Sequence, residues 1–167
     1  NACHRCIAEH QNLGKLRFLI PQNVDNLHLR SGIRPEILAE LHGNVTRPKC
    51  QRCETQVAKS LGLETCSCGG KLISSVINFG EPVYKKDLED AFWHSSQCDL
   101  FMVVGSSLVV APANELPEVA LRGRARLVVI NQGETLVDSR CHLRFDETIP
   151  EVLPPAVDQF KELMKKP

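Results

Sequence analysis

The sequence has no net charge, no long apolar run and no glycine-rich dinucleotide fingerprint. Twenty lysines and arginines balance twenty aspartates and glutamates, so no overall electrostatic attraction favours DNA, RNA or an anionic membrane. No apolar stretch approaches the roughly 20 residues that span a bilayer, and the polar start Asn1-Ala-Cys-His-Arg is unlike a secretory signal. The pattern G-x-G-x-x-G is absent. We therefore expect a soluble protein without a membrane or nucleic-acid partner.

The composition is that of an ordinary globular chain. Hydrophobic residues make up 43% and charged residues 24% of the 167 positions, which excludes a disordered or low-complexity chain. This length suits one hydrophobic core rather than two. We expect a single compact unit that carries an insertion.

Four of the eight cysteines have a spacing typical of metal sites. Cys50 and Cys53 form C-x2-C, and Cys66 and Cys68 form C-x-C after twelve intervening residues. Four thiolates complete a tetrahedral zinc site and leave no position for water, so the expected role is structural. Disulfides or reduced core thiols are the alternatives.

Apolar runs alternate with helical patterns along the chain. Strands are expected at 16–20, 100–104 and 127–130, and helices at 6–13, 87–96, 115–122 and 156–166, the last with Pro154 and Pro155 at or before its start. This alternation predicts an α/β fold with a parallel, Rossmann-like sheet. Residues 45–75 hold the four spaced cysteines and no long periodic segment. We interpret them as a zinc-binding ribbon inserted between the core segments 1–44 and 76–167.

Polar residues follow the apolar runs, at the positions where a doubly wound sheet binds ligands. Backbone N–H groups and hydroxyls of Gly105, Ser106 and Ser107 suit a phosphate or a ribose, and the amide of Asn131 suits ribose hydroxyls. Ordinary structural turns are the alternative interpretation of each position.

Six segments, in order along the chain, resemble the sirtuins, which are NAD-dependent protein deacylases. They are Gln22–His28, similar to the family's Gln-Asn-Ile-Asp-Gly-Leu-His; Glu40–Asn44, similar to its catalytic histidine motif; the four-cysteine ribbon; Ile77–Pro82, similar to Val-Phe-Phe-Gly-Glu; Gly105–Leu108, similar to Gly-Thr-Ser-Leu; and Ile130–Asn131, similar to Ile-Asn. Within the family, Leu29–Gly32 together with Glu40–Asn44 looks most like the chromatin-associated branch.

The resemblance covers the C-terminal two thirds of a sirtuin catalytic core. The family's Gly-Ala-Gly-Ile-Ser phosphate loop and its Arg-Asp-Phe-type motif have no counterpart here, and Asn1 and His4 resemble the Asn-x-x-His that follows them. Asn26 replaces the usual glycine. Asn78 replaces an aromatic residue of the substrate tunnel, which is expected to change the acyl preference.

The resemblance implies that NAD and an acyl-lysine protein or peptide react to give nicotinamide and O-acyl-ADP-ribose. The acyl oxygen displaces nicotinamide, and a base, His42, then activates a ribose hydroxyl. A free imidazole titrates near ~6.5 and accepts a proton at physiological pH.

The same resemblance assigns the binding residues. Those implied for NAD are Gln22, Asn23, Val24, Asp25, Gly105, Ser106, Ser107, Asn131, Gln132 and Ile149; those implied for the substrate are Ile77, Asn78, Phe79, Gly80 and Glu81. The substrate segment is expected to pair with an extended peptide by strand addition. The expected metal is one structural Zn²⁺ held by the four ribbon cysteines.

Other functions remain as alternatives. A mono-ADP-ribosyltransferase would use the same NAD site, and a catalytically incomplete chain would act as a zinc-containing interaction module. A nucleic-acid-binding zinc ribbon is opposed by the neutral charge. The cysteine usage favours a reducing interior, so the expected location is intracellular, in the nucleus or cytoplasm.

Overall fold

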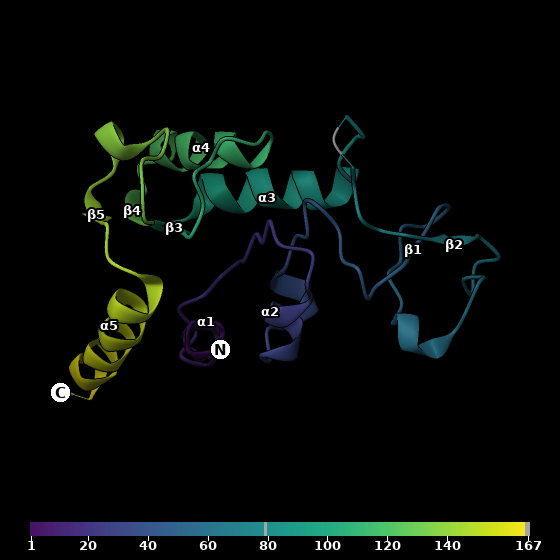
Figure 1. Ribbon diagram of the computed structural model, residues 1–167, viewed down its shortest axis with the longest axis horizontal. Coiled ribbons are helices and arrows are strands. Elements are labelled where there is room, and N and C mark those ends of the chain that lie inside the picture. Colours follow the sequence, from purple (N-terminus) through teal and green to yellow (C-terminus); the bar gives the residue numbers. More distant parts are fainter. Residues whose placement is uncertain (79, 166–167) are drawn as a thin grey trace.

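The computed structural model describes residues 1–78 and 80–165. Its helices are α1 (Ala2–Asn12), α2 (Leu27–Arg30), α3 (Lys85–Gln97), α4 (Leu116–Arg122) and α5 (Ile149–Met164), with the 3-10 helices η1 (Pro35–Ile37), η2 (Lys59–Leu61), η3 (Ala113–Glu115) and η4 (Asp138–Arg140) (Figure 1). Its strands are β1 (Lys49–Cys50), β2 (Leu72–Ile73), β3 (Leu100–Val104), β4 (Arg126–Ile130) and β5 (Leu143–Phe145). None of the described helices is long and apolar enough to cross a bilayer.

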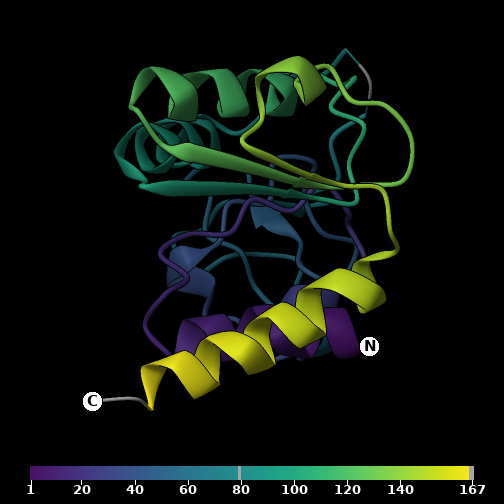
Figure 2. The same cartoon turned by 90° about the vertical axis from the view of Figure 1, so that its left-hand side faces the viewer.

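A three-stranded parallel sheet in the order β3-β4-β5 organises the C-terminal half. Side chains alternate across it: Leu127 and Val129 of β4 pack into one buried cluster, whereas Ile130 packs into another with Leu153 of α5. Figure 2 shows α3 and α4 on one face of the sheet and α1 and α5 on the other. The predicted α/β fold with a Rossmann-like parallel sheet is therefore confirmed.

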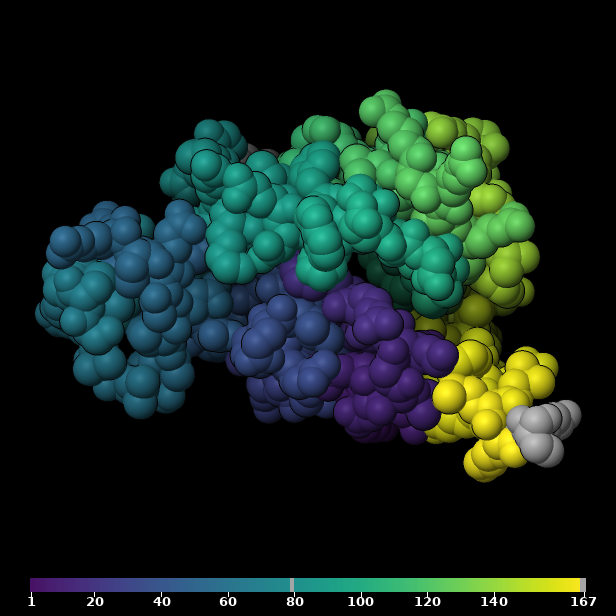
Figure 3. Space-filling view, turned by 180° about the vertical axis from the view of Figure 1, so that it is seen from behind, coloured from purple at the N-terminus to yellow at the C-terminus, as the bar shows by residue number. Residues whose placement is uncertain are grey.

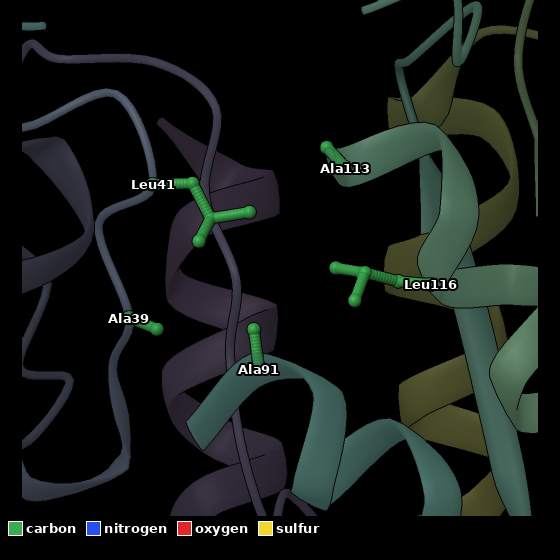
Figure 4. Packing of buried hydrophobic residues seen from close by; sticks show 5 residues of the cluster. All are labelled: Ala39, Leu41, Ala91, Ala113 and Leu116. Carbon is green, nitrogen blue, oxygen red and sulfur yellow. The ribbon is translucent and has the colours of Figure 1, made fainter. Parts of the chain in front are cut away.

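A further buried cluster attaches the N-terminal loops to this layered core. Ala39 and Leu41 pack against Ala91 of α3 and Leu116 of α4 (Figure 4). Leu41 has no exposed surface, and burial of a leucine side chain contributes about 2 kcal/mol. Its anchorage fixes the position of His42, the next residue in the chain.

The apolar run Leu16–Ile20 is not a strand, contrary to the prediction. Only Leu19 takes part in a β-bridge, with Leu38, through backbone bonds to Ile37 and Ala39. Phe18 and Ile20 are instead partly buried by side-chain packing, because they lie against the cluster around Leu41. Burial therefore explains the apolar pattern without a hydrogen-bonded ladder.

The last helix begins at Ile149 rather than Ala156, so Pro154 and Pro155 lie inside it. The Thr148 side chain and Glu151 form a capping box that starts the helix upstream. The two prolines remove bonds only to carbonyls of the first turn. Packing of Leu153 and Val157 against the sheet and α1 stabilises the helix despite that loss.

Candidate active site

The imidazole of His42 is oriented by the backbone of the loop that follows Ile20. Its Nδ1 lies 2.8 Å from the carbonyl oxygen of Gln22. A carbonyl oxygen only accepts hydrogen bonds, so Nδ1 carries the proton in the neutral ring and Nε2 keeps the lone pair. This tautomer leaves Nε2 as the atom able to accept a proton.

Three predicted functional segments are joined at His42 by one series of hydrogen bonds. The Gln22 side chain donates to Ser106 Oγ at 2.8 Å, at the carboxyl end of β3. The Ile77 backbone N–H donates to the carbonyl oxygen of His42 at 3.1 Å. Residues predicted for the cofactor, the base and the substrate, which lie far apart in the sequence, therefore meet at one place.

Gly43 permits the closest of these approaches. Its φ is +80°, and a Cβ there would lie 1.8 Å from the carbonyl oxygen of Ser75. The buried Ser75 hydroxyl also donates to the Asn44 carbonyl and accepts from the Asn44 N–H, at 2.9 and 3.0 Å. The segment before Ile77 is thereby fixed against the His42 loop.

The sequence assigns no role to Glu40 and Asn44, whose side chains stabilise the His42 loop by hydrogen bonds. The Asn44 amide donates to Glu40 Oε1 at 2.6 Å and to Asn26 Oδ1 at 2.9 Å. Burial raises the pKa of Glu40 above its ordinary value of 4.5. Both residues belong to the segment that carries the resemblance around His42, which was the available signal.

The start of α5 lies at the carboxyl ends of β3 and β4. Gly105 has a φ of +64°, and a Cβ there would lie 2.9 Å from Ile149 Cδ1. Ile149 is the first residue of α5. Asn131 follows β4, and its amide donates to the carbonyls of Gln132 and Gly133 at 3.1 Å.

The remaining predicted cofactor residues are neighbours of Gln22 and Ser106 in the sequence, but their side chains form fewer hydrogen bonds. Asp25 accepts a hydrogen bond from the Leu27 N–H at 2.9 Å, which is the turn-capping geometry expected for a structural role. Val24 bonds through its carbonyl to the Val45 N–H at 3.0 Å. Asn23 and Ser107 are exposed and form no side-chain hydrogen bond within residues 1–78 and 80–165.

The predicted substrate segment ends in a tight turn. The Asn78 backbone and amide N–H groups both donate to Glu81 Oε2, at 2.8 and 3.1 Å, and the Glu81 N–H donates back to the Asn78 carbonyl. The bond from the Asn78 backbone lowers the pKa of Glu81. Gly80 is exposed between them, and Phe79 lies outside the described residues.

The four spaced cysteines form one cluster, as predicted. Strands β1 and β2 pair antiparallel and place Cys50 opposite Leu72. The ligand atoms of all four cysteines lie within 4.8 Å of one another. A hydrogen bond with Thr55 lowers the pKa of Cys53 to about 6, which favours its thiolate.

The spacing of the sulfur atoms fits zinc. Sγ atoms of Cys50 and Cys68 are 3.5 Å apart, those of Cys53 and Cys66 are 3.7 Å apart, and those of Cys53 and Cys68 are 3.4 Å apart. Zn–S bonds of about 2.3 Å in a tetrahedron place sulfurs about 3.8 Å apart. These distances exceed the ~2.05 Å of a disulfide bond, so the cysteines fit one structural Zn²⁺.

A buried ion pair joins the cysteine-bearing strand β1 to helix α3. Lys49 Nζ lies 2.9 Å from Asp87 Oδ2 and 3.4 Å from the centroid of the Tyr84 ring. The Lys49 side chain is 5% exposed and that of Asp87 is 17% exposed. The ribbon is therefore fastened to the core where the predicted substrate segment enters α3.

The chain matches known proteins along almost its whole length. The model of the Sir2 family matches residues 1–112. NAD-dependent protein deacetylase 1 of Geobacillus kaustophilus is 41% identical over 167 residues, which cover 96% of this chain and 67% of that protein. NAD-dependent protein deacylase 2 of Archaeoglobus fulgidus is 35% identical over 173 residues, covering 98% and 68%. The chain thus spans about two thirds of these relatives.

Solved structures agree with the sequence comparisons. One described as Sir2 with a p53 peptide and NAD⁺ has a TM-score of 0.79 and 33% identity, covering 97% of this chain and 70% of that one. Another, described as addressing the mechanism and regulation of Sir2 enzymes, has a TM-score of 0.82 and 35% identity, covering 99% and 69%. The fold, the ordered motifs and both comparisons lead to one conclusion: the chain belongs to the Sir2 family.

Proposed function

We propose that the protein is an NAD-dependent protein-lysine deacylase that releases nicotinamide and O-acyl-ADP-ribose. The hydrogen-bonded series from Ser106 through Gln22 and His42 to Ile77 carries this proposal. It joins the turn at the end of β3, the imidazole of His42 and the segment that we propose to bind the peptide. The relatives named as NAD-dependent deacetylase and deacylase support the same activity.

In this proposal His42 is the general base. NAD supplies the nicotinamide leaving group and the ribose hydroxyl that is later deprotonated. Nε2 of His42 accepts that proton, while the Gln22 carbonyl holds Nδ1–H and so stabilises the imidazolium that forms. The Leu41 anchor keeps the ring in position between the two binding segments.

The two binding sites lie on either side of His42. NAD contacts are proposed at residues 22–25, 105–107, 131, 132 and 149, which lie in the loop after Ile20, at the ends of β3 and β4 and at the start of α5. Residues 77–81 are proposed to bind the acyl-lysine peptide by strand addition, because Asn78, Gly80 and Glu81 are exposed beside the His42 loop. Asn78 stands where the resemblance implies an aromatic residue of the substrate tunnel, and its amide, which donates to Glu81 here, should favour an acyl group that accepts a hydrogen bond.

The zinc ribbon is proposed to be structural, as an insertion at 45–75 between the core segments 1–44 and 76–167. The sulfurs of Cys50, Cys53, Cys66 and Cys68 would fill all four positions of a tetrahedral zinc ion and leave none for a substrate or a water. Four thiolates and further free cysteines need a reducing compartment, which supports an intracellular location in the nucleus or cytoplasm.

The test is to incubate the zinc-loaded chain with NAD and peptides bearing acetyl-, propionyl- or succinyl-lysine, and to record products by mass spectrometry. The proposal expects free lysine peptide, nicotinamide and O-acyl-ADP-ribose in equal amounts. A mass gain of one ADP-ribose on protein, with the acyl-lysine intact, would favour the ADP-ribosyltransferase alternative. Zinc binding without any of these products would favour the interaction module.

A further inference from the structure

An open groove of about 660 Å³ lies between helix α2 and the 3-10 helix η2, and the proposed reaction does not use it. One wall comes from Asn26, Leu29 and Arg30, and the other from the segments that contain Arg47 and Lys59. Figure 3 shows the surface hollowed between α2 and the part of the chain that carries the four cysteines. The groove is thus formed where two structural units of the chain face each other.

The groove is positively charged although the whole chain is neutral. Arg30, Arg47 and Lys59 line it together with neutral residues, and no carboxylate does. None of the three cations forms an ion pair with any residue in the described part of the chain. Arg47 is partly compensated by the nearby Glu40 carboxylate, so Arg30 and Lys59 contribute most of the unpaired charge. A concave surface with uncompensated charge of one sign concentrates the field and attracts the opposite charge.

We propose that this groove binds an acidic segment of a protein partner. The three cations can each meet a carboxylate, and the Ser60 hydroxyl adds a hydrogen-bond donor, whereas the Thr46 hydroxyl already donates to Asn44 Oδ1. Leu29 and Ala58 supply an apolar lining for the methylene groups and backbone between acidic residues. The combination of cations, a hydroxyl donor and a small apolar surface matches an extended Asp- and Glu-rich peptide.

The same residues do not suit a nucleic acid. No aromatic side chain lines the groove, so bases would have no ring on which to stack. The zero net charge of the chain offers no wider field along which a phosphate backbone could extend beyond the groove. An acidic peptide needs only the local charges and is therefore the occupant that the groove favours.

The inference is tested by fluorescence anisotropy with a labelled Asp- and Glu-rich peptide and the full zinc-loaded chain. Binding should weaken with added salt, and replacement of the acidic residues by Asn and Gln should abolish it. Arg30→Glu and Lys59→Glu, both at exposed positions, should each weaken binding by about tenfold or more. Lys71→Glu is the matched control, because Lys71 is an exposed ribbon lysine outside the groove.

Three results would overturn the proposal: equal binding of the neutral peptide, unchanged affinity in both groove variants, or preferential binding of an oligothymidylate that the groove variants abolish. Melting curves of the variants establish that each is folded. The assay contains no NAD, so its outcome is independent of the proposed deacylase activity.

Discussion

Lys49 of β1 and Asp87 of α3, 38 positions apart in the sequence, form an ion pair that is largely shielded from solvent. Tyr84, which precedes α3, covers the ammonium group with its ring. The proposed peptide-binding residues lie in the segment that connects β2 of the ribbon to α3. The ion pair holds β1 of the ribbon against α3 and so fixes both ends of this segment.

Lys49→Met is predicted to lower the free energy of unfolding by about 3 kcal/mol, because it leaves the Asp87 carboxylate buried without a partner. Lys49→Met combined with Asp87→Leu should recover much of the loss. Urea unfolding of the zinc-loaded chain measures both. The control is Lys86→Met, whose pair with Asp90 is exposed and should contribute less than about 0.5 kcal/mol. A Lys49→Met loss no larger than the control would contradict the contact.

Gly43→Ala is predicted to destabilise the chain by about 3 kcal/mol or more, because the added Cβ collides with the Ser75 carbonyl. Gly62→Ala is the matched control. Gly62 has a similar φ of +62° with nothing within 4 Å of its Cβ, so only the backbone penalty of about 1 kcal/mol applies. Equal losses of stability would show that the loops at Gly43 and Ser75 do not approach as closely as described.

Zinc removal is predicted to unfold the β1–β2 ribbon. One zinc per chain should be found by elemental analysis, and a chelator should lower the melting temperature and raise hydrogen exchange at residues 49–73. Cys66→Ser should lose the metal, whereas Cys98→Ser, outside the cluster, should retain it. A chelated chain with unchanged melting and exchange would rule out a structural zinc.

The sequence predicts those features that depend on local patterns. Leu100–Val104 is a parallel strand as predicted, because five consecutive apolar residues suffice to mark one, although Val103 alone is buried in it. The cysteine spacing predicts the metal cluster. The sequence does not predict the start of α5 at Ile149, because proline preferences are local and the packing of Leu153 overrides them. The contacts of Lys49 with Asp87 and of Asn44 with Asn26 join distant segments, so no local pattern indicates them.

The neighbouring rings of His4 and His28, tilted by 46° to each other, predict a pH dependence of stability. Their centroids are 4.6 Å apart, and burial lowers the pKa of both below the ordinary 6.5. The proximity of His4 lowers the pKa of His28 further. The unfolded chain therefore binds more protons than the folded one as the pH falls through 6.5, and stability is lost on acidification.

His28→Phe keeps a ring and removes the titration, so it should flatten the fall in unfolding free energy between about pH 7 and pH 5. Thermal or urea unfolding across this range measures the slopes. A His28→Phe slope equal to that of the parent would mean that the His4 and His28 pair does not determine the pH response.

The most direct test of the account separates the two chemical steps at His42. Since the base is needed only after nicotinamide has left, His42→Ala should still exchange labelled nicotinamide into NAD in the presence of an acetyl-lysine peptide. It should form O-acetyl-ADP-ribose at least about 10²-fold more slowly than the parent chain, with an unchanged circular dichroism spectrum. Equal yields of O-acetyl-ADP-ribose from the two chains would contradict the role of His42, and no exchange by the parent chain would contradict the deacylase proposal itself.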